Sequence, residues 1–465
     1  MSAPSETPPA PRSAWDVQRW EHTRLRRRML TGRWAEDLRA RVREELGTER
    51  NEAIGKPDLS SNVFAHVCGS ISVLYDVPYK VVHDDPAAAA AMTALLLRSG
   101  VFAQMQDVQR MTLGLREMLL RVDVIDPGEA AKAPLDRVVL IVRPVPPDMV
   151  EARPHPTRVG EPSWIAEAVY RDIGGEMVWT WEVADIKGTL RVLSADRSED
   201  ITAKVYSQAY EGDAYPWHDA AGKPVLPYVM YHAQVGAQLW DPWAWAEIVE
   251  GTLSAGVNWT HFGHGLRNAS WPQRWAVGVR LGTDTSTEGR KYVIADPTTC
   301  VMFEQKEDAA NVQIGQWMPG ASPREMLDAV EAYEHRQALH VVPATDILRA
   351  SGDPRSGYAL ALSREGRREA ARRYEPPFRH ADQRLLETVA AAVNGAVGED
   401  VLPYDGWGVE YQALPPTMEE QKADEDRRAA LQKRLVDAVA AQLITIDQAR
   451  AEYAAGVASM GAGNG

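Results

Sequence analysis

Two histidines and two cysteines are the residue types in this chain that could bind a metal ion. His261 and His264 stand three positions apart in HFGHG, a spacing that puts both rings on one side of a helix. No acidic third ligand is near them in the sequence, and Cys68 and Cys300 have no cysteine or histidine at ligand spacing. We therefore expect no metal site and no cofactor, and we interpret both cysteines as buried small residues of a reducing compartment.

The sequence also lacks the patterns of common catalytic sites. Pro224 follows Gly222 and Lys223 and breaks a phosphate-binding loop, and no dinucleotide fingerprint, zinc-protease motif or serine nucleophile elbow occurs. Acidic residues are too scattered for one pair to be singled out as acid and base. The chain is therefore predicted not to be an enzyme.

Aromatic residues supply the alternative from another class. The fifteen tryptophans, among them Trp240, Trp243 and Trp245, could stack on sugars. A tryptophan-rich soluble enzyme that acts on a carbohydrate polymer is thus the alternative, although amphipathic tryptophan spacing is more typical of a core or an interface.

Length and charge limit the remaining classes. The 465 residues allow about two to four domains. Lys plus Arg is 51 and Asp plus Glu is 65, and the net charge of −14 disfavours a globally basic nucleic-acid binder. The longest nearly apolar run, Ala87–Leu97, is too short for a membrane helix, and the polar, proline-rich start MSAPSETPPAPR is typical of a loose arm. We expect a globular protein that stays in the cytoplasm where it is made.

The first half of the chain combines predicted helices with a β-rich region. Helical periodicity covers Ser13–Leu46, whose many arginines indicate a solvated face or, alternatively, contact with an acidic partner. Asn62–Tyr79 is mixed and strand-like over Ile71–Tyr75, and a long helix is predicted over Asp85–Leu120. β-Branched and alternating patterns then predict strands, two of them joined by a hairpin turn at Gly174 and Gly175, over Val138–Val142, Trp164–Tyr170, Met177–Val183 and Thr189–Ser194.

The second half is predicted to be mostly helical. A strand over Lys223–His232 precedes a helix that Asp241 and Pro242 open, and short strands are expected over Trp271–Gln305. Ser322, Pro323 and Glu325 form the start of the next helix. The elements predicted after it are a helix over Ser322–Leu339, a loop over Val342–Gly357, a helix over Tyr358–Val397 that kinks or breaks at Pro376 and Pro377, a strand over Gly408–Ala413, a helix from Thr417 to Gln442, and a helix over Thr445–Ala455.

Three stretches in this order resemble the portal proteins of tailed bacteriophages. The first is AGKPVLPYVMYH at Ala221–His232, a strand that leads into a stem helix. The second is SGYALALSREGRREAARRYEPPFRHADQRLLETV at Ser356–Val389, similar to the step into the long wing helix. The third is GVEYQALPPTMEEQ at Gly408–Gln421 with LITIDQAR at Leu443–Arg450, similar to the strand, turn and helix of the crown.

The resemblance implies a portal-type α+β fold with an α/β wing, a two-helix stem, a small β-containing clip, a long kinked wing helix and a helical C-terminal crown. The implied boundaries are a flexible arm at 1–12, the wing at 13–240, a stem helix at 241–270, the clip at 271–321, a stem helix at 322–342, the tunnel loop at 343–357, the rest of the wing at 358–414 and the crown at 415–465.

The implied function is a homo-oligomeric ring of twelve subunits at one capsid vertex, through which double-stranded DNA is packaged and ejected. Its implied partners are the large terminase, a head-completion or neck adaptor, and the major capsid and scaffold proteins, with no membrane. We expect a virion protein assembled in the host cytoplasm, and another virion head-completion protein is a further alternative.

Two sets of residues would serve that function. Arg349 and Arg355 lie in the implied tunnel loop and are the candidates for transient phosphate contact. Gly251, Gly256 and Gly263 in the first stem helix are predicted to allow close packing between neighbouring subunits. The arginines just beyond the tunnel loop, at 364, 367, 368, 372 and 373, are more simply explained by pairing with Glu365, Glu369 and Glu375 or with a neighbouring subunit.

Overall fold

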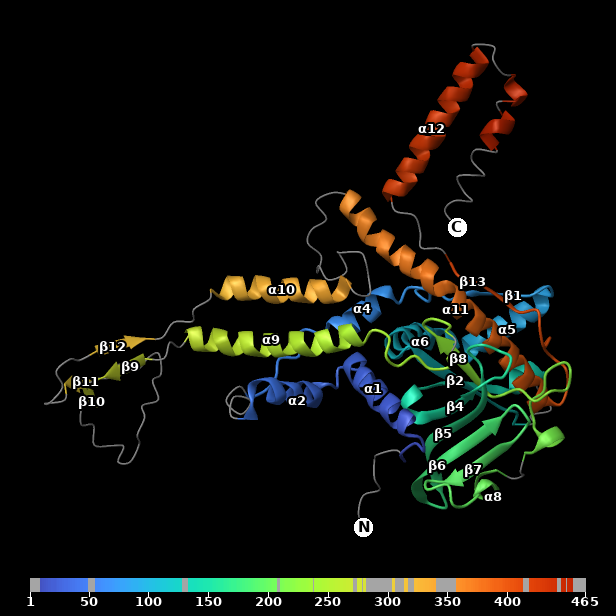
Figure 1. The fold of residues 1–465 in the computed structure, drawn as a ribbon. Coiled ribbons are helices and arrows are strands. Elements are labelled where there is room, and N and C mark those ends of the chain that lie inside the picture. Colours follow the sequence, from blue (N-terminus) through green and yellow to red (C-terminus); the bar gives the residue numbers. More distant parts are fainter. Residues whose placement is uncertain are drawn as a thin grey trace. The chain divides into compact units, whose positions relative to one another are not determined.

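The structure is a computed structural model that describes residues 9–48, 55–127, 133–206, 210–236, 238–270, 274–277, 279–281, 303–305, 313–316, 322–339, 357–412, 418–440, 445–448 and 450–454. Helices and strands both contribute (Figure 1), which confirms the predicted α+β class. The contacts divide the chain into two compact units. The first contains Met1–Arg27, Val67–Ala244 and Val342–Gly465, and the second contains Arg28–His66 and Trp245–Val341.

A three-stranded antiparallel sheet in the order β3-β2-β8 lies at the centre of the first unit. Its strands are β2 (Glu117–Ile125), β3 (Val139–Val145) and β8 (Tyr228–His232). Helices α6 (Val101–Leu115) and α11 (Gly357–Val397) pack against this sheet. The sequence did not predict β2, because its residues continue the apolar pattern of the preceding helix.

A four-stranded antiparallel sheet packs on the first one. Its strands, in the order β4-β5-β6-β7, are Val150–Pro154, Pro162–Ile173, Glu176–Asp185 and Leu190–Ser194. Gly174 and Gly175 turn the chain between β5 and β6 with φ values of 66° and 90°. Both angles are positive, as a two-residue hairpin turn requires, so the predicted hairpin is confirmed.

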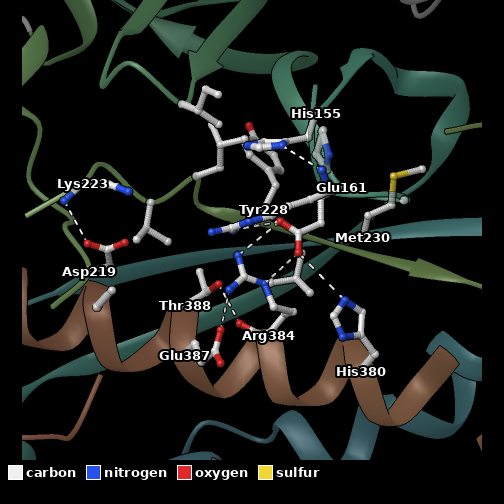
Figure 2. A pocket seen from close by; sticks show the side chains of 18 of the residues that line it. His155, Glu161, Asp219, Lys223, Tyr228, Met230, His380, Arg384, Glu387 and Thr388 are labelled. Carbon is white, nitrogen blue, oxygen red and sulfur yellow. Dashed lines mark hydrogen bonds and ion pairs between the residues drawn. The ribbon is translucent and has the colours of Figure 1, made fainter. Parts of the chain in front are cut away.

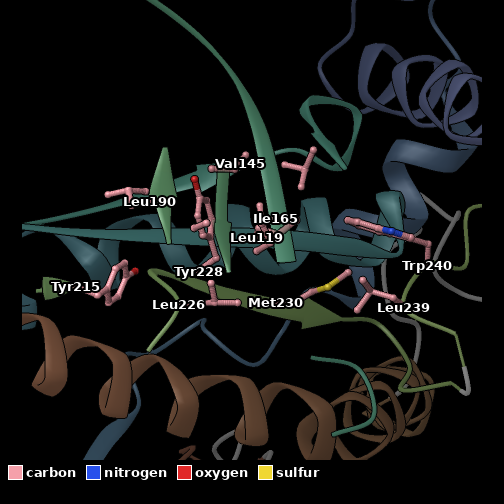
Figure 3. Packing of buried hydrophobic residues seen from close by; sticks show 12 residues of the cluster. Leu119, Val145, Ile165, Leu190, Tyr215, Leu226, Tyr228, Met230, Leu239 and Trp240 are labelled. Atoms are coloured by element: carbon pink, nitrogen blue, oxygen red, sulfur yellow. The ribbon is translucent and has the colours of Figure 1, made fainter. Parts of the chain in front are cut away.

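The side chains between the two sheets form an apolar cluster (Figure 3). Leu119 of β2 faces Val145 and Met230 across the register, and these side chains pack with Ile165 and Leu190 of the second sheet. Alternation along β8 sends Tyr231 to the opposite face, where its hydroxyl reaches α11. The first sheet is therefore buried between the second sheet and a helical layer.

The single helix predicted over Asp85–Leu120 is wrong. The structure has α5 (Pro86–Arg98) and α6, separated at Ser99 and Gly100, and then enters β2. Gly100 has a φ of 72°, a left-handed conformation that ends the first helix. The predicted start is confirmed, because Asp85 accepts the backbone N–H of Ala87 at 2.9 Å and caps α5.

The strand-like interpretation of Ile71–Tyr75 is also wrong. Helix α4 (Val63–Ile71) ends there, and the following strand is β1 (Lys80–Val82). β1 pairs with β13 (Gly408–Glu410), which confirms the core of the strand predicted over Gly408–Ala413. Tyr75 is buried, as its apolar neighbours in the sequence indicated. The same apolar neighbours did not distinguish a strand from a helix end followed by a turn.

The passage from β8 into the next helix begins later than predicted. Of the predicted strand Lys223–His232, Tyr228–His232 forms a strand and Pro224 a single β-bridge with His218, and α9 begins at Ala246 instead of Asp241. The backbone N–H of Asp241 donates to Glu117 at 2.7 Å, and Trp245 has a φ of 65°. The tertiary hydrogen bond of Asp241 and the left-handed backbone of Trp245 both place 241–245 outside the helix.

Helix α11 runs without interruption through Pro376 and Pro377, so the chain does not break into two helices there, which was one of the two predicted outcomes. It ends where Gly398, with a φ of 78°, donates its N–H to the carbonyl of Asn394. Helix α12 (Met418–Ala440) follows β13, and residues 446–448 and 450–454 are helical as predicted. Thr417, the predicted cap of α12, lies outside the described residues.

The second unit contains a helical hairpin and two small pairs of strands. Its elements are α2 (Ala35–Leu46), the start of α4, α9 (Ala246–Ser270), β9 (Arg274–Val277), β10 (Val279–Leu281), β11 (Phe303–Gln305), β12 (Gln313–Gln316) and α10 (Pro323–Leu339). β9 pairs with β12 and β10 with β11, both antiparallel, so the strand pairs are nested between α9 and α10. Ser322 and Glu325 exchange backbone-to-side-chain hydrogen bonds, which confirms the predicted cap of α10.

Short elements complete the described chain. Helix α1 is followed by a turn at Gly32, which divides the helical region predicted over Ser13–Leu46 into two helices. At the last residue of the predicted arm 1–12, the backbone N–H of Arg12 donates to Glu151 at 3.1 Å. The remaining bounds are α1 (Ala14–Leu30), α7 (Pro134–Arg137), η1 (Pro147–Met149), α8 (Thr202–Val205) and η2 (Gly212–Ala214).

In the described part of the chain, no single helix has the length and hydropathy needed to cross a bilayer. Helices α5 and α6 would meet those criteria only as a pair, and they are bent by 75° at the break between them.

Candidate functional site

Helices α9 and α10 form an antiparallel hairpin. Gly251 near the start of α9 lies against Gln337 near the end of α10, and Gly265 near the end of α9 lies against Met326 near the start of α10. The nested strand pairs occupy the connection between the two helices. In sequence order, α9, the two strand pairs and α10 therefore form a helix–β–helix unit.

A carboxylate on α10 fixes the hairpin. Glu334 accepts hydrogen bonds from the indole N–H of Trp259 on α9 and from the hydroxyl of Ser61. The backbone N–H of Asp58 donates to the hydroxyl of Thr260 at 2.8 Å. The segment before α4 is thus tied to both helices of the same unit.

The three predicted packing glycines have different surroundings. A Cβ at Gly251 would overlap the side-chain amide of Gln337, and one at Gly256 would lie 2.9 Å from both terminal methyls of Leu38. A Cβ at Gly263 would meet nothing within 4 Å. Gly251 and Gly256 therefore allow close packing inside this chain, and Gly263 is the glycine with room for a neighbouring molecule.

The predicted DNA-contact residues, Arg349 and Arg355, lie outside the described residues, as does most of the predicted tunnel loop. The described parts of the predicted clip are its four short strands.

The structure describes the side chains of some of the arginines on α11. Arg372 and Arg373 are exposed, and among the described residues neither has a carboxylate partner. Glu375, predicted to pair with them, pairs with Arg379 one turn further along. The side chains at 364–368 lie outside the described part.

The candidate metal ligands do not form a cluster in the described chain. His261 is exposed, and no group of three potential ligands surrounds it and His264. Cys68 is fully buried, and burial raises the pKa of its thiol to about 12. Cys300 lies in a stretch that the structure does not describe.

A buried ionic network, which the sequence did not predict, joins the two sheets. Arg121 of β2 binds Asp123 at 3.0 Å, Glu167 at 3.3 Å and also Glu182. Burial alone would raise the pKa of Glu182, but Arg121 and Arg171 lower it to about 2. The network joins charged groups of both sheets, so it fixes the packing of one sheet on the other.

A second buried carboxyl stands on α11. Asp382 is fully buried and accepts hydrogen bonds from the hydroxyls of Tyr75 at 2.8 Å, Tyr231 at 2.7 Å and Tyr411. Burial raises the pKa of Asp382 to about 7, against the opposing effect of the tyrosine hydrogen bonds. No signal in the sequence indicated this cluster, because polar residues surround Asp382 in the chain and its partners come from distant segments.

A cavity of about 540 Å³ lies in the first unit between α11, β8 and the loop before β5 (Figure 2). Glu161 on that loop binds Arg384 of α11 at 3.2 Å and Arg158 at 3.2 Å. His232 at the end of β8 is bonded to the carbonyl of Gly160, and burial lowers the pKa of this histidine. Glu161, Arg158 and Arg384 at this cavity are therefore paired with one another.

No family model matches this sequence, and no curated protein matches it. Among solved structures, the chain is similar to a chain of the "virion of native gene transfer agent (GTA) particle", with 13% identity and a TM-score of 0.41. The match covers 84% of this chain and 90% of that one. Similarity of this extent carries no argument about function.

Proposed function

We propose that this chain is the subunit of a portal ring in a phage-like virion, through which double-stranded DNA is packaged and later ejected. The observation that carries the proposal is the α9–α10 hairpin with nested strand pairs in its connection. That arrangement suits a stem of two helices that ends in a small β clip.

The remaining elements have places in the same scheme. The two sheets with α6 and α11 would form the wing, and α12 with the helical residues after it would form the crown. Residues 343–356 would be the tunnel loop between stem and wing, with Arg349 and Arg355 in transient contact with DNA phosphates.

The negative net charge of the chain favours passage of DNA through the ring and disfavours tight binding of the DNA. A ring of subunits with a net charge of −14 each would repel the phosphate backbone over most of its surface. Neutralising many phosphates would instead add salt-dependent affinity at each step and retard the DNA. The partners of this ring would be the large terminase, a neck adaptor, and the capsid and scaffold proteins, with ATP hydrolysis supplied by the terminase.

The environment of the tryptophans does not favour the alternative of a carbohydrate enzyme. Trp20, Trp34, Trp181 and Trp240 are buried in the described core, where they cannot stack on a polymer. Trp243 is partly exposed, but its ring packs edge-on against His22 at 4.1 Å between centroids.

Native mass spectrometry of the purified full-length chain tests the proposal. A portal subunit should give one closed assembly of about twelve chains that persists on dilution. A monomer or small oligomer that hydrolyses a polysaccharide would contradict the proposal and support the enzyme.

A further inference from the structure

The cavity beside α11 continues as a groove along the same helix. It passes from the cavity of about 540 Å³ over Val159 and Val235 to Pro376 and Pro377, and neighbouring hollows share these residues and His380. All of these residues belong to the first unit. We call this surface the α11 groove.

Exposed apolar side chains form the floor of the α11 groove. Val159 is 65% exposed and Val235 is 44% exposed, and the prolines of α11 stand beside them. Large aliphatic side chains with this much exposure are favourable contacts for a docked apolar side chain. The groove therefore offers hydrophobic contact as well as polar groups.

The two prolines also leave backbone acceptors at the groove. A proline has no N–H, so Pro376 and Pro377 cannot donate to the carbonyls of Arg372 and Arg373 four residues earlier. Pro376 and both arginines line the same stretch of the groove. Two helix carbonyls thus lack their usual donors where a second chain could supply N–H groups.

Charge at this end of the groove is positive. Among the described carboxylates beside it, Glu161 and Glu387 bind Arg384 and Glu375 binds Arg379, while Glu369 lies one turn before Arg372 and Arg373 on α11. Arg372 and Arg373 are exposed and have no carboxylate partner in the described chain. This local excess of guanidinium groups stands out in a protein with a net charge of −14.

We propose that the α11 groove binds an extended, acidic segment of another protein, with apolar side chains on Val159 and Val235, backbone N–H groups on the carbonyls of Arg372 and Arg373, and carboxylates on their guanidinium groups. A nucleic acid fits less well, because its sugar-phosphate backbone carries acceptors and no N–H donors for those carbonyls. This proposal concerns a surface separate from the stem and does not depend on ring formation.

Fluorescence anisotropy with the full-length protein tests it. The probe is a fluorescein-labelled twelve-residue peptide of alternating glutamate and valine. The comparators are the lysine–valine peptide, the glutamate–valine peptide with N-methylated valines, and a twelve-nucleotide thymidine oligomer. We expect the glutamate–valine peptide to bind most tightly at low salt, and N-methylation to weaken it at least threefold.

The variant Arg372→Glu/Arg373→Glu should weaken that binding about tenfold or more, and Val159→Asp should weaken it as well. The control Arg33→Glu/Arg43→Glu makes the same charge change at exposed arginines outside the groove and should leave the affinity unchanged. Equal loss in the control, no loss in the groove variants, or tighter binding of the oligonucleotide would overturn the proposal. Circular dichroism checks that each variant is folded.

Discussion

At the scale of single residues, Asp382 shows how one buried carboxyl joins distant parts of the chain. Its three tyrosine partners come from the segment after α4, from β8 and from the residue that follows β13. Because burial raises the pKa of Asp382 to about 7, the folded protein binds this proton more tightly than the unfolded chain, whose aspartates titrate near 4. The stability that this proton contributes is complete below about pH 4 and is lost as the pH rises to about 7.

Asp382→Asn should remove that pH dependence. Between pH 5 and pH 8, we expect the contribution of Asp382 to lower the free energy of unfolding of the wild-type protein by roughly 2 kcal/mol, and the variant to lack this contribution. Urea unfolding of both proteins at the two pH values measures the difference. The same pH dependence in both proteins would show that Asp382 titrates normally.

Alanine substitutions at two glycines of α9 should change the stability of the chain in opposite directions. Gly256→Ala should destabilise the folded chain by about 1–3 kcal/mol, because its Cβ would press on the buried side chain of Leu38. Gly263→Ala has open space and should stabilise α9 by up to about 1 kcal/mol. Denaturant unfolding compares the two, and equal effects would contradict the packing described for Gly256.

Residues with local signals could be predicted from the sequence, and those joined by tertiary contacts could not. Ser322 with Glu325 and Gly174 with Gly175 act within a few positions of each other, so their roles could be read directly. Arg121 gives no such signal, because its partners include Glu167 and Glu182 on another sheet.

Among helices and strands, too, local signals could be read from the sequence and tertiary contacts could not. The pairing of β5 with β6 and the extent of α10 were predicted because periodicity and end signals agreed. The break between α5 and α6 was missed because one glycine interrupts a long apolar pattern. The signal at Asp241 and Pro242 placed the start of α9 too early, because contact with Glu117 holds that segment outside the helix.

We expect the two prolines inside helix α11 to reduce the stability of the folded chain. Pro376→Ala/Pro377→Ala restores two N–H donors inside the helix and should raise the free energy of unfolding by roughly 2 kcal/mol or more, after about 1 kcal/mol of loss from a more flexible unfolded chain. Thermal or urea unfolding of the full-length protein measures the change. A less stable variant would mean that the prolines contribute packing that outweighs the missing hydrogen bonds.

For the whole molecule, we propose that the chain is one subunit in the wall of a ring around DNA. The order of a β-rich region, a helical hairpin with strand pairs in its connection, a long helix and C-terminal helices could be anticipated from local patterns in the sequence. The grouping of Arg28–His66 with α9 and α10 could not, because it depends on contacts such as those of Leu38 and Thr252.

Negative-stain electron microscopy of the purified full-length chain tests whether its subunits form a ring around a DNA-sized channel. Class averages should show closed rings with a central hole wide enough for a DNA duplex and a rotational symmetry near twelvefold. Compact particles without a hole, at every protein concentration examined and also in the presence of capsid and scaffold proteins, would contradict it.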